Sequence, residues 1–294
     1  MAEKKKHRLD RVDGYYIEDM DSFHKYFAHL NPDRIGCEVC LLSTLDCTEA
    51  LKLMDEQRKL NPDMHITFFH LILTAMAKMV YNRPKMNRFV SGRRFYQRKD
   101  IILSFVAKKK FSDDGEEAMM MLKPKEDDNL LSLSRKVSGE VKEAKKDTGE
   151  QYGADKALDT VAKFPRWLMK IVMGVFRIMD NNGLFPKSFM DVDPNFSTIL
   201  LSNLGSIKCK SVYHHLSNFG TNSIILTIGT IHKEEKIMDD GSKQIRDVVD
   251  FGITIDERIG DGFYFSKCMK LVQYIFDNPQ LLLDPVSAVV DYEG

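Results

Sequence analysis

The sequence predicts an α/β protein in which helices cover a mixed β-sheet in a two-layer arrangement. Three observations support this fold class. Strand-like runs are separated by helical ones along most of the chain, and several strand-like runs follow one another in its last third. In addition, 294 residues with 43% hydrophobic content allow a large core to form. A mixed sheet is expected because helical crossovers permit parallel pairs and short turns permit antiparallel ones.

Apolar periodicity places the elements in order along the chain. The predicted strands are 36–45, 93–96, 100–107, 118–122, 197–202, 223–231 and 245–255. The predicted helices are 48–60, 68–83, 129–146, 163–180 and 263–276. The helix from Phe68, which Thr67 can cap, is apolar on nearly every side and is therefore expected to be buried. A polar turn that contains Asp239, Asp240 and Gly241 is expected to join the last two strands.

Charge and cysteine content exclude several classes of protein. The 43 basic residues balance the 43 acidic ones and form no long basic patch, so no nucleic-acid partner is expected. The N-terminus has no apolar run of signal-peptide length, and the five cysteines are an odd number spread over a long chain, so we expect a cytoplasmic protein without disulfides. Cys37 and Cys40 form a C-x-x-C pair, but no second pair follows at metal-ligand spacing, so we expect buried thiols and no metal.

The segment 163–180 is the most apolar helical stretch apart from the helix at Phe68. Lys170 and Arg177 interrupt it, whereas a membrane-spanning helix needs about 20 mostly apolar residues. We expect this helix to pack on the body of the protein or on a partner subunit. Membrane contact through Trp167 to Met179, with the helix lying in the membrane plane, is the less favoured alternative.

Four segments carry a family resemblance, whereas the common nucleotide-binding, hydrolase and zinc-protease motifs are absent from the sequence. The segments are LSTLDCTEALKLMDEQRKL (42–60), ITFFHLILTAMAKMVYNRPKMNRFV (66–90), TILLSNLGSI (198–207) and FGITIDERIGDGFYFSKCMKLVQYIFDNPQLLL (251–283). In this order they resemble the catalytic domain of the dihydrolipoamide acyltransferases of 2-oxoacid dehydrogenase complexes, and the related chloramphenicol acetyltransferase.

The resemblance implies a coenzyme-A-dependent acyltransferase fold and a homotrimer with channels between its subunits. Coenzyme A or acyl-coenzyme A would be the substrate. Residues 36–294 would form the catalytic domain, with the apolar helix near 163–186 as an insertion, and residues 1–35 would pack on this body. No lipoyl domain is recognisable before the catalytic domain, so no covalent lipoyl group is expected.

The family's signature turn reads His-x-x-x-Asp-Gly, and here Glu257 stands in the place of the catalytic His. That His is the general base that removes a proton from the thiol. Arg258 and Gly262 belong to the same turn, and Asp261 matches a structural acid that pairs with a basic side chain in the family. In the matching N-terminal region, 19–27, only Lys25 offers such a partner.

The Ser-Asn-Leu-Gly strand end supplies the second half of the expected site. Ser202 matches the serine whose hydroxyl stabilises the oxyanion of the tetrahedral intermediate, and Asn203 follows it in the turn. His214 and His215 lie on the next loop and are the residues that could substitute as a base.

The replacement of His by Glu257 leaves two hypotheses of different class. The ordinary pKa of a glutamate, about 4.3, is poorly matched to that of a thiol, about 8.5, so standard thiol activation would be lost. The first hypothesis is an acyltransferase that moves an acyl group from a thioester to a small acceptor, with a desolvated Glu257 or a histidine from elsewhere as the base. The second is an inactive homologue that serves as a ligand-binding or protein-interaction scaffold.

Overall fold

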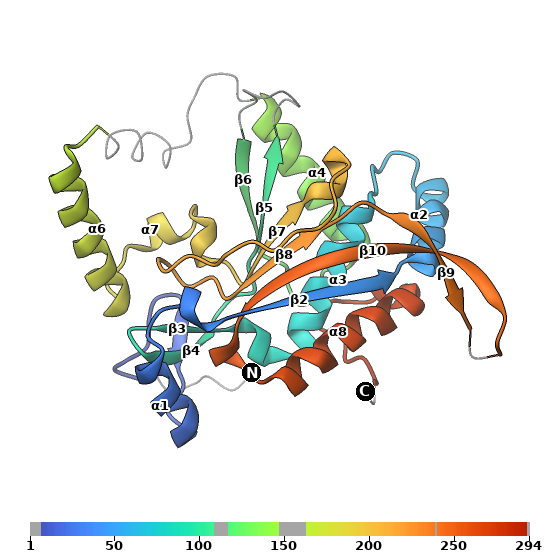
Figure 1. The fold of residues 1–294 in the computed structure, drawn as a ribbon. Coiled ribbons are helices and arrows are strands. Elements are labelled where there is room, and N and C mark those ends of the chain that lie inside the picture. The colour runs from blue at the N-terminus through green and yellow to red at the C-terminus, as the bar shows by residue number, and fades with distance from the viewer. Residues whose placement is uncertain (1–6, 109–116, 147–162, 239, 293–294) are drawn as a thin grey trace.

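A computed structural model describes residues 7–108, 117–146, 163–238 and 240–292. Its main sheet has seven strands (Figure 1). In spatial order they are β2 (Glu38–Asp46), β10 (Lys243–Asp256), β8 (Ile224–Ile228), β7 (Ile199–Asn203), β5 (Leu103–Lys108) and β6 (Glu117–Leu122), with β9 (His232–Ile237) paired to β10. The pairs β5–β7 and β7–β8 are parallel and the other pairs are antiparallel, so the predicted mixed sheet is confirmed.

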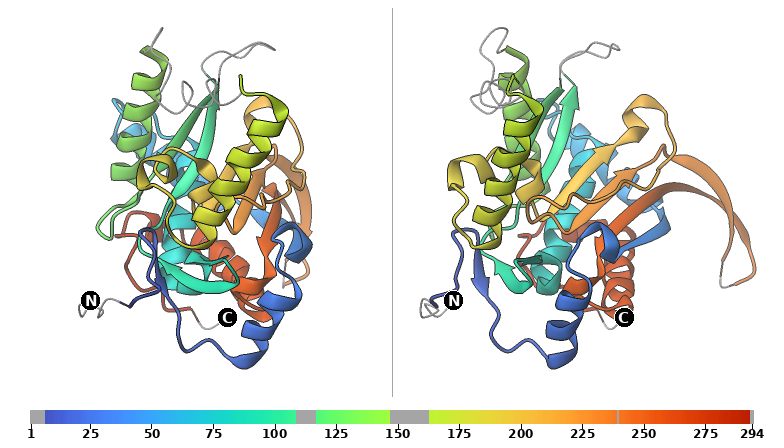
Figure 2. Two further views of the ribbon diagram at one scale, coloured as in Figure 1. Left: turned by 90° about the vertical axis from the view of Figure 1, so that its left-hand side faces the viewer. Right: turned by 60° about the vertical axis from the view of Figure 1, so that its left-hand side comes forward.

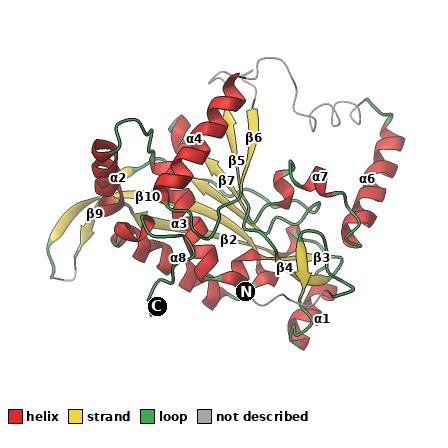
Figure 3. Ribbon diagram, turned by 180° about the vertical axis from the view of Figure 1, so that it is seen from behind, coloured by secondary structure: helices red, strands yellow, loops and turns green. Residues whose placement is uncertain are grey.

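One face of this sheet is covered by a layer of four helices (Figure 3). They are α2 (Thr48–Leu60), α3 (Phe68–Asn82), α4 (Leu130–Lys146) and α8 (Gly262–Asp277). The central helix is α3, whose residues from His70 to Val80 are all buried, as the apolar pattern predicts. Leu73 of α3, Leu133 of α4 and Ile275 of α8 share one hydrophobic core with the sheet, which makes the main sheet and these helices one packed unit.

A second, smaller sheet contains the N-terminal segment. Its three strands lie in the order β1 (Gly14–Tyr16), β4 (Arg94–Arg98) and β3 (Arg88–Ser91). Helix α1 (Ser22–Leu30) begins at Asp21, whose carboxylate accepts a hydrogen bond from the backbone N–H of His24. On another side of the molecule lie α6 (Arg166–Asn181) and the short α7 (Lys187–Met190), well apart from the helical layer (Figure 1).

The sequence interpretation differs from the structure mainly at short or polar strands. Residues 232–237 form β9, where the sequence predicted part of a polar turn, and β10 begins at Lys243 rather than at residue 245. β9 and the first half of β10 form a ribbon that projects beyond the sheet (Figure 1). Because most residues of β9 are exposed, the strand has no apolar alternation to reveal it. Asp239 lies outside the described residues.

Candidate functional site

Glu257 opens a single 3-10 turn, Glu257–Ile259, directly after the last residue of β10. A buried ion pair holds this turn. The Arg258 guanidinium donates from Nε and Nη2 to the two carboxylate oxygens of Asp256, at 2.7 Å each, and Asp256 also accepts the backbone N–H of Arg258. Arg258 is 2% exposed and Asp256 is fully buried, so the pair is shielded from water.

A second arginine and the N-terminal segment complete this buried network. Arg34 Nε lies 3.6 Å from Asp256, and its Nη1 and Nη2 donate to the carbonyl oxygens of Ser217 and Val90. Burial lowers the pKa of the Arg34 guanidinium, with the charge of Asp256 opposing that shift. For Arg258, burial lowers the pKa, but the hydrogen bonds and charge of Asp256 outweigh this effect, so its pKa is raised. Arg34 therefore ties the turn to two further segments of the chain, those of Val90 and Ser217.

The Glu257 side chain itself is half-buried and takes no part in this network. Within the described residues it has no hydrogen bond and no ion pair. The network thus fixes the backbone that carries Glu257, while both carboxylate oxygens remain able to accept hydrogen bonds from a ligand or from another copy of the chain.

Asp261 caps helix α8 rather than pairing with a basic side chain. Its carboxylate accepts the backbone N–H of Tyr264 at 2.7 Å, and no ion pair of Asp261 is found within the described ranges. Lys25, the only basic residue that the sequence offered, donates to the carbonyl oxygen of Glu18 instead. Gly262 is the first residue of α8, and a Cβ added there would meet no atom within 4 Å.

Ser202 lies one residue before the end of β7 and is half-buried. The next residue, Asn203, caps the turn Leu204–Ile207, because its side-chain oxygen accepts the backbone N–H of Ser206 at 3.3 Å. The Ser202 hydroxyl makes no hydrogen bond to the described part of the chain, so it is able to donate one to a ligand.

Strand register places Ser202 and Glu257 at opposite ends of the sheet. Ser202 aligns with Thr227 of β8, which aligns with Gly252 of β10, and Glu257 follows Gly252 by five residues. With a rise of about 3.3 Å per residue and about 4.8 Å between strands, the two backbone positions are roughly 19 Å apart. One chain therefore does not bring the two candidate residues to a common small ligand.

The histidines that could substitute as a base are exposed and contact each other. The rings of His214 and His215 stack with centroids 4.9 Å apart, and His214 Nδ1 lies 2.9 Å from the carbonyl oxygen of His215. Neither is hydrogen-bonded or ion-paired to Glu257 or Ser202 in the described segments. His70 is a buried core histidine whose Nδ1 accepts the backbone N–H of Thr67, and burial lowers its pKa to about 4.

The cysteines do not form a metal site in the part of the chain that the structure describes. Cys37 is buried beside the Glu257 turn, and burial raises the pKa of its thiol. Cys40 is exposed on β2, so the expectation that both thiols are buried is wrong for Cys40. It points away from the core because side chains alternate along a strand.

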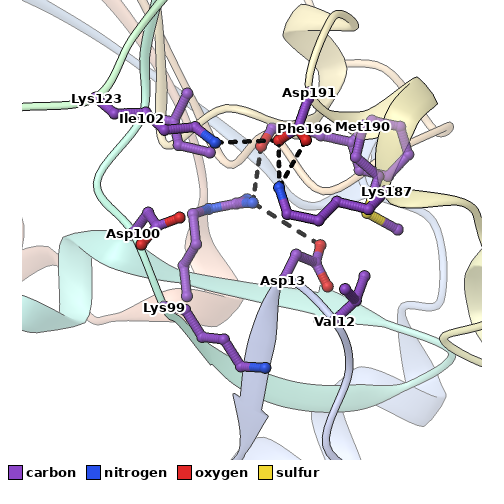
Figure 4. A pocket seen from close by; sticks show the side chains of 11 residues that line it. Val12, Asp13, Lys99, Asp100, Ile102, Lys123, Lys187, Met190, Asp191 and Phe196 are labelled. Carbon is purple, nitrogen blue, oxygen red and sulfur yellow. Dashed lines mark hydrogen bonds and ion pairs between the residues drawn. The ribbon is translucent and has the colours of Figure 1, made fainter.

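A small charged cavity lies between β4 and α7 and away from both candidate residues (Figure 4). Its volume of about 30 Å³ is room for about one water molecule. Asp191 bridges Lys123 and Lys187 at its rim, at 3.0 and 2.6 Å. Its lining residues are Val12, Asp13, Arg98, Lys99, Asp100, Ile102, Lys123, Lys187, Met190, Asp191 and Phe196. A cavity of this volume offers no room for an acyl donor.

Sequence reasoning identified Arg258 as a turn residue but missed the partners that give it this role. Asp256 and Arg34 form the rest of the network and were not predicted. The alternation Asp-x-Arg at 256 and 258 was a visible signal, because an acid and a base two residues apart at a strand end can pair. Arg34 carried no such signal, since it reaches the turn only through the fold.

The architecture and the position of these residues define the class of fold: that of the chloramphenicol acetyltransferase type. Residues 190–284, which include Ser202 and the Glu257 turn, match the sequence model of the 2-oxoacid dehydrogenases acyltransferase (catalytic domain). The resemblance drawn from the sequence is thereby confirmed. A search of curated proteins gives no match.

Solved structures agree with this assignment over most of the chain. The cubic core of the pyruvate dehydrogenase multienzyme complex is 15% identical with a TM-score of 0.61, covering 91% of this chain and 94% of the other. Dihydrolipoamide acetyltransferase from Azotobacter vinelandii is 16% identical with a TM-score of 0.61 and the same coverage of both chains. A chloramphenicol acetyltransferase is 14% identical with a TM-score of 0.53, covering 90% and 99%.

Proposed function

We propose that this protein transfers an acyl group from a coenzyme A thioester to a small acceptor, at a site formed between copies of the chain. The observation that carries the proposal is the Glu257 turn. A buried network of Asp256, Arg258 and Arg34 fixes the turn, and it presents a carboxylate that has no partner in the described residues. The Azotobacter relative was studied for the catalytic roles of a serine, a histidine and an asparagine, the last two being four residues apart, as Glu257 and Asp261 are here.

The transfer requires one base and one oxyanion donor. Glu257 would take the proton of the acceptor as its nucleophilic atom attacks the thioester carbonyl. Ser202 would donate a hydrogen bond to the oxygen that becomes negative in the tetrahedral intermediate. When that intermediate collapses, the carbon–sulfur bond breaks, and the protonated Glu257 returns the proton to the departing thiolate, which accepts it readily because a thiol is the weaker acid.

A site that contains both residues has to be formed by two copies of the chain. The separation of roughly 19 Å that follows from strand spacing is too large for one small reacting group to bridge. The homotrimer with intersubunit channels that the family resemblance implies would place Ser202 of one copy near Glu257 of the next. The similarity to a cubic multienzyme core supports such self-association.

Complementation between variants tests the shared site. We expect Ser202→Ala and Glu257→Gln to abolish most transfer when each is prepared alone. After the two are unfolded together and refolded, about a quarter of the sites in a random trimer would combine both intact residues, so about a quarter of the activity should return. If each variant carries a different affinity tag, sequential capture on both tags shows that mixed oligomers have formed. Mixed oligomers without any return of activity would show that the shared site is wrong.

The function itself is tested first by calorimetric titration with coenzyme A and with acetyl-coenzyme A. Saturable micromolar binding supports an acyl-donor site, and transfer to small thiols, amines and alcohols can then be screened. The absence of binding to a folded oligomer would contradict the proposal.

The second candidate function is a scaffold that has lost catalysis. The presence of Glu257 where the family has its catalytic His favours it, because a glutamate is poorly matched to activate a thiol. Under the scaffold hypothesis, large aromatic side chains such as Trp167, Tyr213 or Phe185 would block the acyl-donor channel. In the subunit Trp167 and Tyr213 are exposed, and Phe185 packs in a local aromatic cluster with Phe196 and Phe219. A folded oligomer that binds neither ligand would favour the scaffold.

A further inference from the structure

Helix α6 exposes an apolar stripe that no part of the described chain covers. Trp167, Ile171, Val175 and Ile178 are 64, 55, 47 and 64% exposed. They recur at intervals of four, four and three residues, so they lie along one face of the helix. We call these four residues the outer stripe. Four large apolar side chains exposed in a continuous row are unusual on a soluble surface and indicate an interaction site.

A row of basic side chains runs beside the outer stripe. Arg166, Lys170 and Arg177 each directly precede a stripe residue, so they occupy an adjacent face of the helix. The only acidic residue of α6, Asp180, is buried against Arg11. Arg177 has one exposed partner, Asp33, at 3.6 Å, which is a weak surface interaction. The exposed surface of α6 is therefore apolar and positively charged, although the whole chain has no net charge.

The opposite side of α6 packs against the body of the protein, so the outer stripe faces away from the body. Phe176 packs edge-on against Phe185, with ring centroids 5.4 Å apart, and Met179 joins the same cluster. Asp180 accepts a hydrogen bond from Arg11 Nη2 at 2.8 Å. When the molecule is viewed from this side, α6 lies in front of the rest of the protein (Figure 2, left).

We propose that the outer stripe of α6 binds the surface of an anionic lipid membrane, with the helix lying in the membrane plane. The apolar face would enter the boundary between headgroups and acyl chains, and the basic row would contact the negative headgroups. No helix among the described residues is long and apolar enough to cross a membrane, so the proposal concerns surface binding. Trp at one end of the stripe suits this interfacial depth, because an indole has an apolar body and a polar N–H.

The charge pattern favours a lipid surface over a second α6 helix as the occupant. A contact between two α6 helices around a twofold axis would bring two basic rows together, and like charges repel. An anionic membrane instead complements every member of the row.

The chain carries its own probe, because Trp167 is its only tryptophan. We expect the Trp emission of the full-length protein to shift to the blue on addition of phosphatidylglycerol vesicles and to be quenched by bromine atoms placed on the acyl chains. Phosphatidylcholine vesicles should produce a much smaller shift. No shift with either vesicle, or equal shifts with both, would overturn the proposal.

Matched variants test whether vesicle binding depends on the outer stripe and on the row of basic side chains. The double variant Ile171→Ser, Ile178→Ser keeps the Trp probe and should weaken vesicle partitioning by at least about tenfold. Arg166→Gln and Lys170→Gln should each weaken it by about fivefold. The controls are Ile237→Ser, 75% exposed on β9, and Lys59→Gln on α2, which should change nothing. If the double variant instead dissociates an oligomer in sedimentation and the vesicles have no effect, the stripe is a contact between copies and the proposal fails.

Discussion

The two candidate residues lie at opposite ends of one sheet, and the two ends are built in different ways. At the Glu257 end, a buried carboxylate and two arginines hold the turn. At the Ser202 end, the backbone is held by close packing: a Cβ on Gly205 would lie 2.5 Å from the carbonyl oxygen of Gly229. One end therefore depends on charge and the other on the absence of a side chain, so each should fail under a different kind of substitution.

Removal of Arg258 should have the largest effect on stability. Arg258→Ala leaves the buried carboxylate of Asp256 with the backbone N–H of residue 258 and with Arg34 Nε at 3.6 Å, and breaking a buried ion pair costs about 3–5 kcal/mol in the free energy of unfolding. Urea denaturation measures this loss. Lys52→Ala, which removes an exposed pair with Glu49, should cost about 0–1 kcal/mol and serves as the control. Equal losses in both variants would show that the turn does not depend on the buried network.

The acid–base chemistry of Glu257 should limit transfer to thiols at the same end of the sheet. Glu257→His should raise acyl transfer from acetyl-coenzyme A to a small thiol by about 100-fold, because an imidazole has a pKa suited to proton removal from a thiol. The measurement is product formation, followed by chromatography, in a variant with an unchanged urea transition. Glu257→Gln is the matched control, since it removes the charge without adding a base. A rise of similar size in that control would mean that charge, and not basicity, limits the reaction.

The comparison also shows how far sequence reasoning can reach. The mixed sheet, the buried helix α3 and the strand that carries Ser202 followed from local apolar patterns, because each pattern reports the surroundings of its own element. Arg34 and its carbonyl partners Val90 and Ser217 could not be predicted, since they meet only after three distant segments have packed. Within the described residues the carboxylate of Asp261 caps helix α8 and pairs with no basic side chain, which the motif alone does not reveal.

The separation of the two candidate residues could also be found only in the structure. Ser202 and Glu257 belong to motifs that can be recognised in the sequence, but neither motif contains information on the register between β7, β8 and β10. Register depends on pairing across the sheet, which a single strand does not encode.

Steric crowding at the Ser202 end should give an intermediate effect. Gly205→Ala forces a methyl group against the backbone of Gly229, which cannot move as a flexible side chain would, so we expect a loss of about 1–3 kcal/mol in unfolding free energy. Thermal and urea unfolding measure it. Gly36→Ala, where a Cβ would meet nothing within 4 Å, is the control. A loss no larger than that of the control would show that the packing at this end is loose.

The smallest effect on stability is expected at Gly262. Here, unlike at Arg258, the substitution should raise the free energy of unfolding. No atom of the described chain lies within 4 Å of an added Cβ, and alanine favours a helix over glycine, so Gly262→Ala should stabilise the subunit by about 0.5–1 kcal/mol. A glycine there is then not required by the subunit itself. If a ligand or a second copy approaches α8 at this point, the same methyl group should weaken coenzyme A binding by about tenfold. Calorimetry and urea denaturation of one variant separate these effects, and a gain in stability with unchanged binding would place the ligand elsewhere.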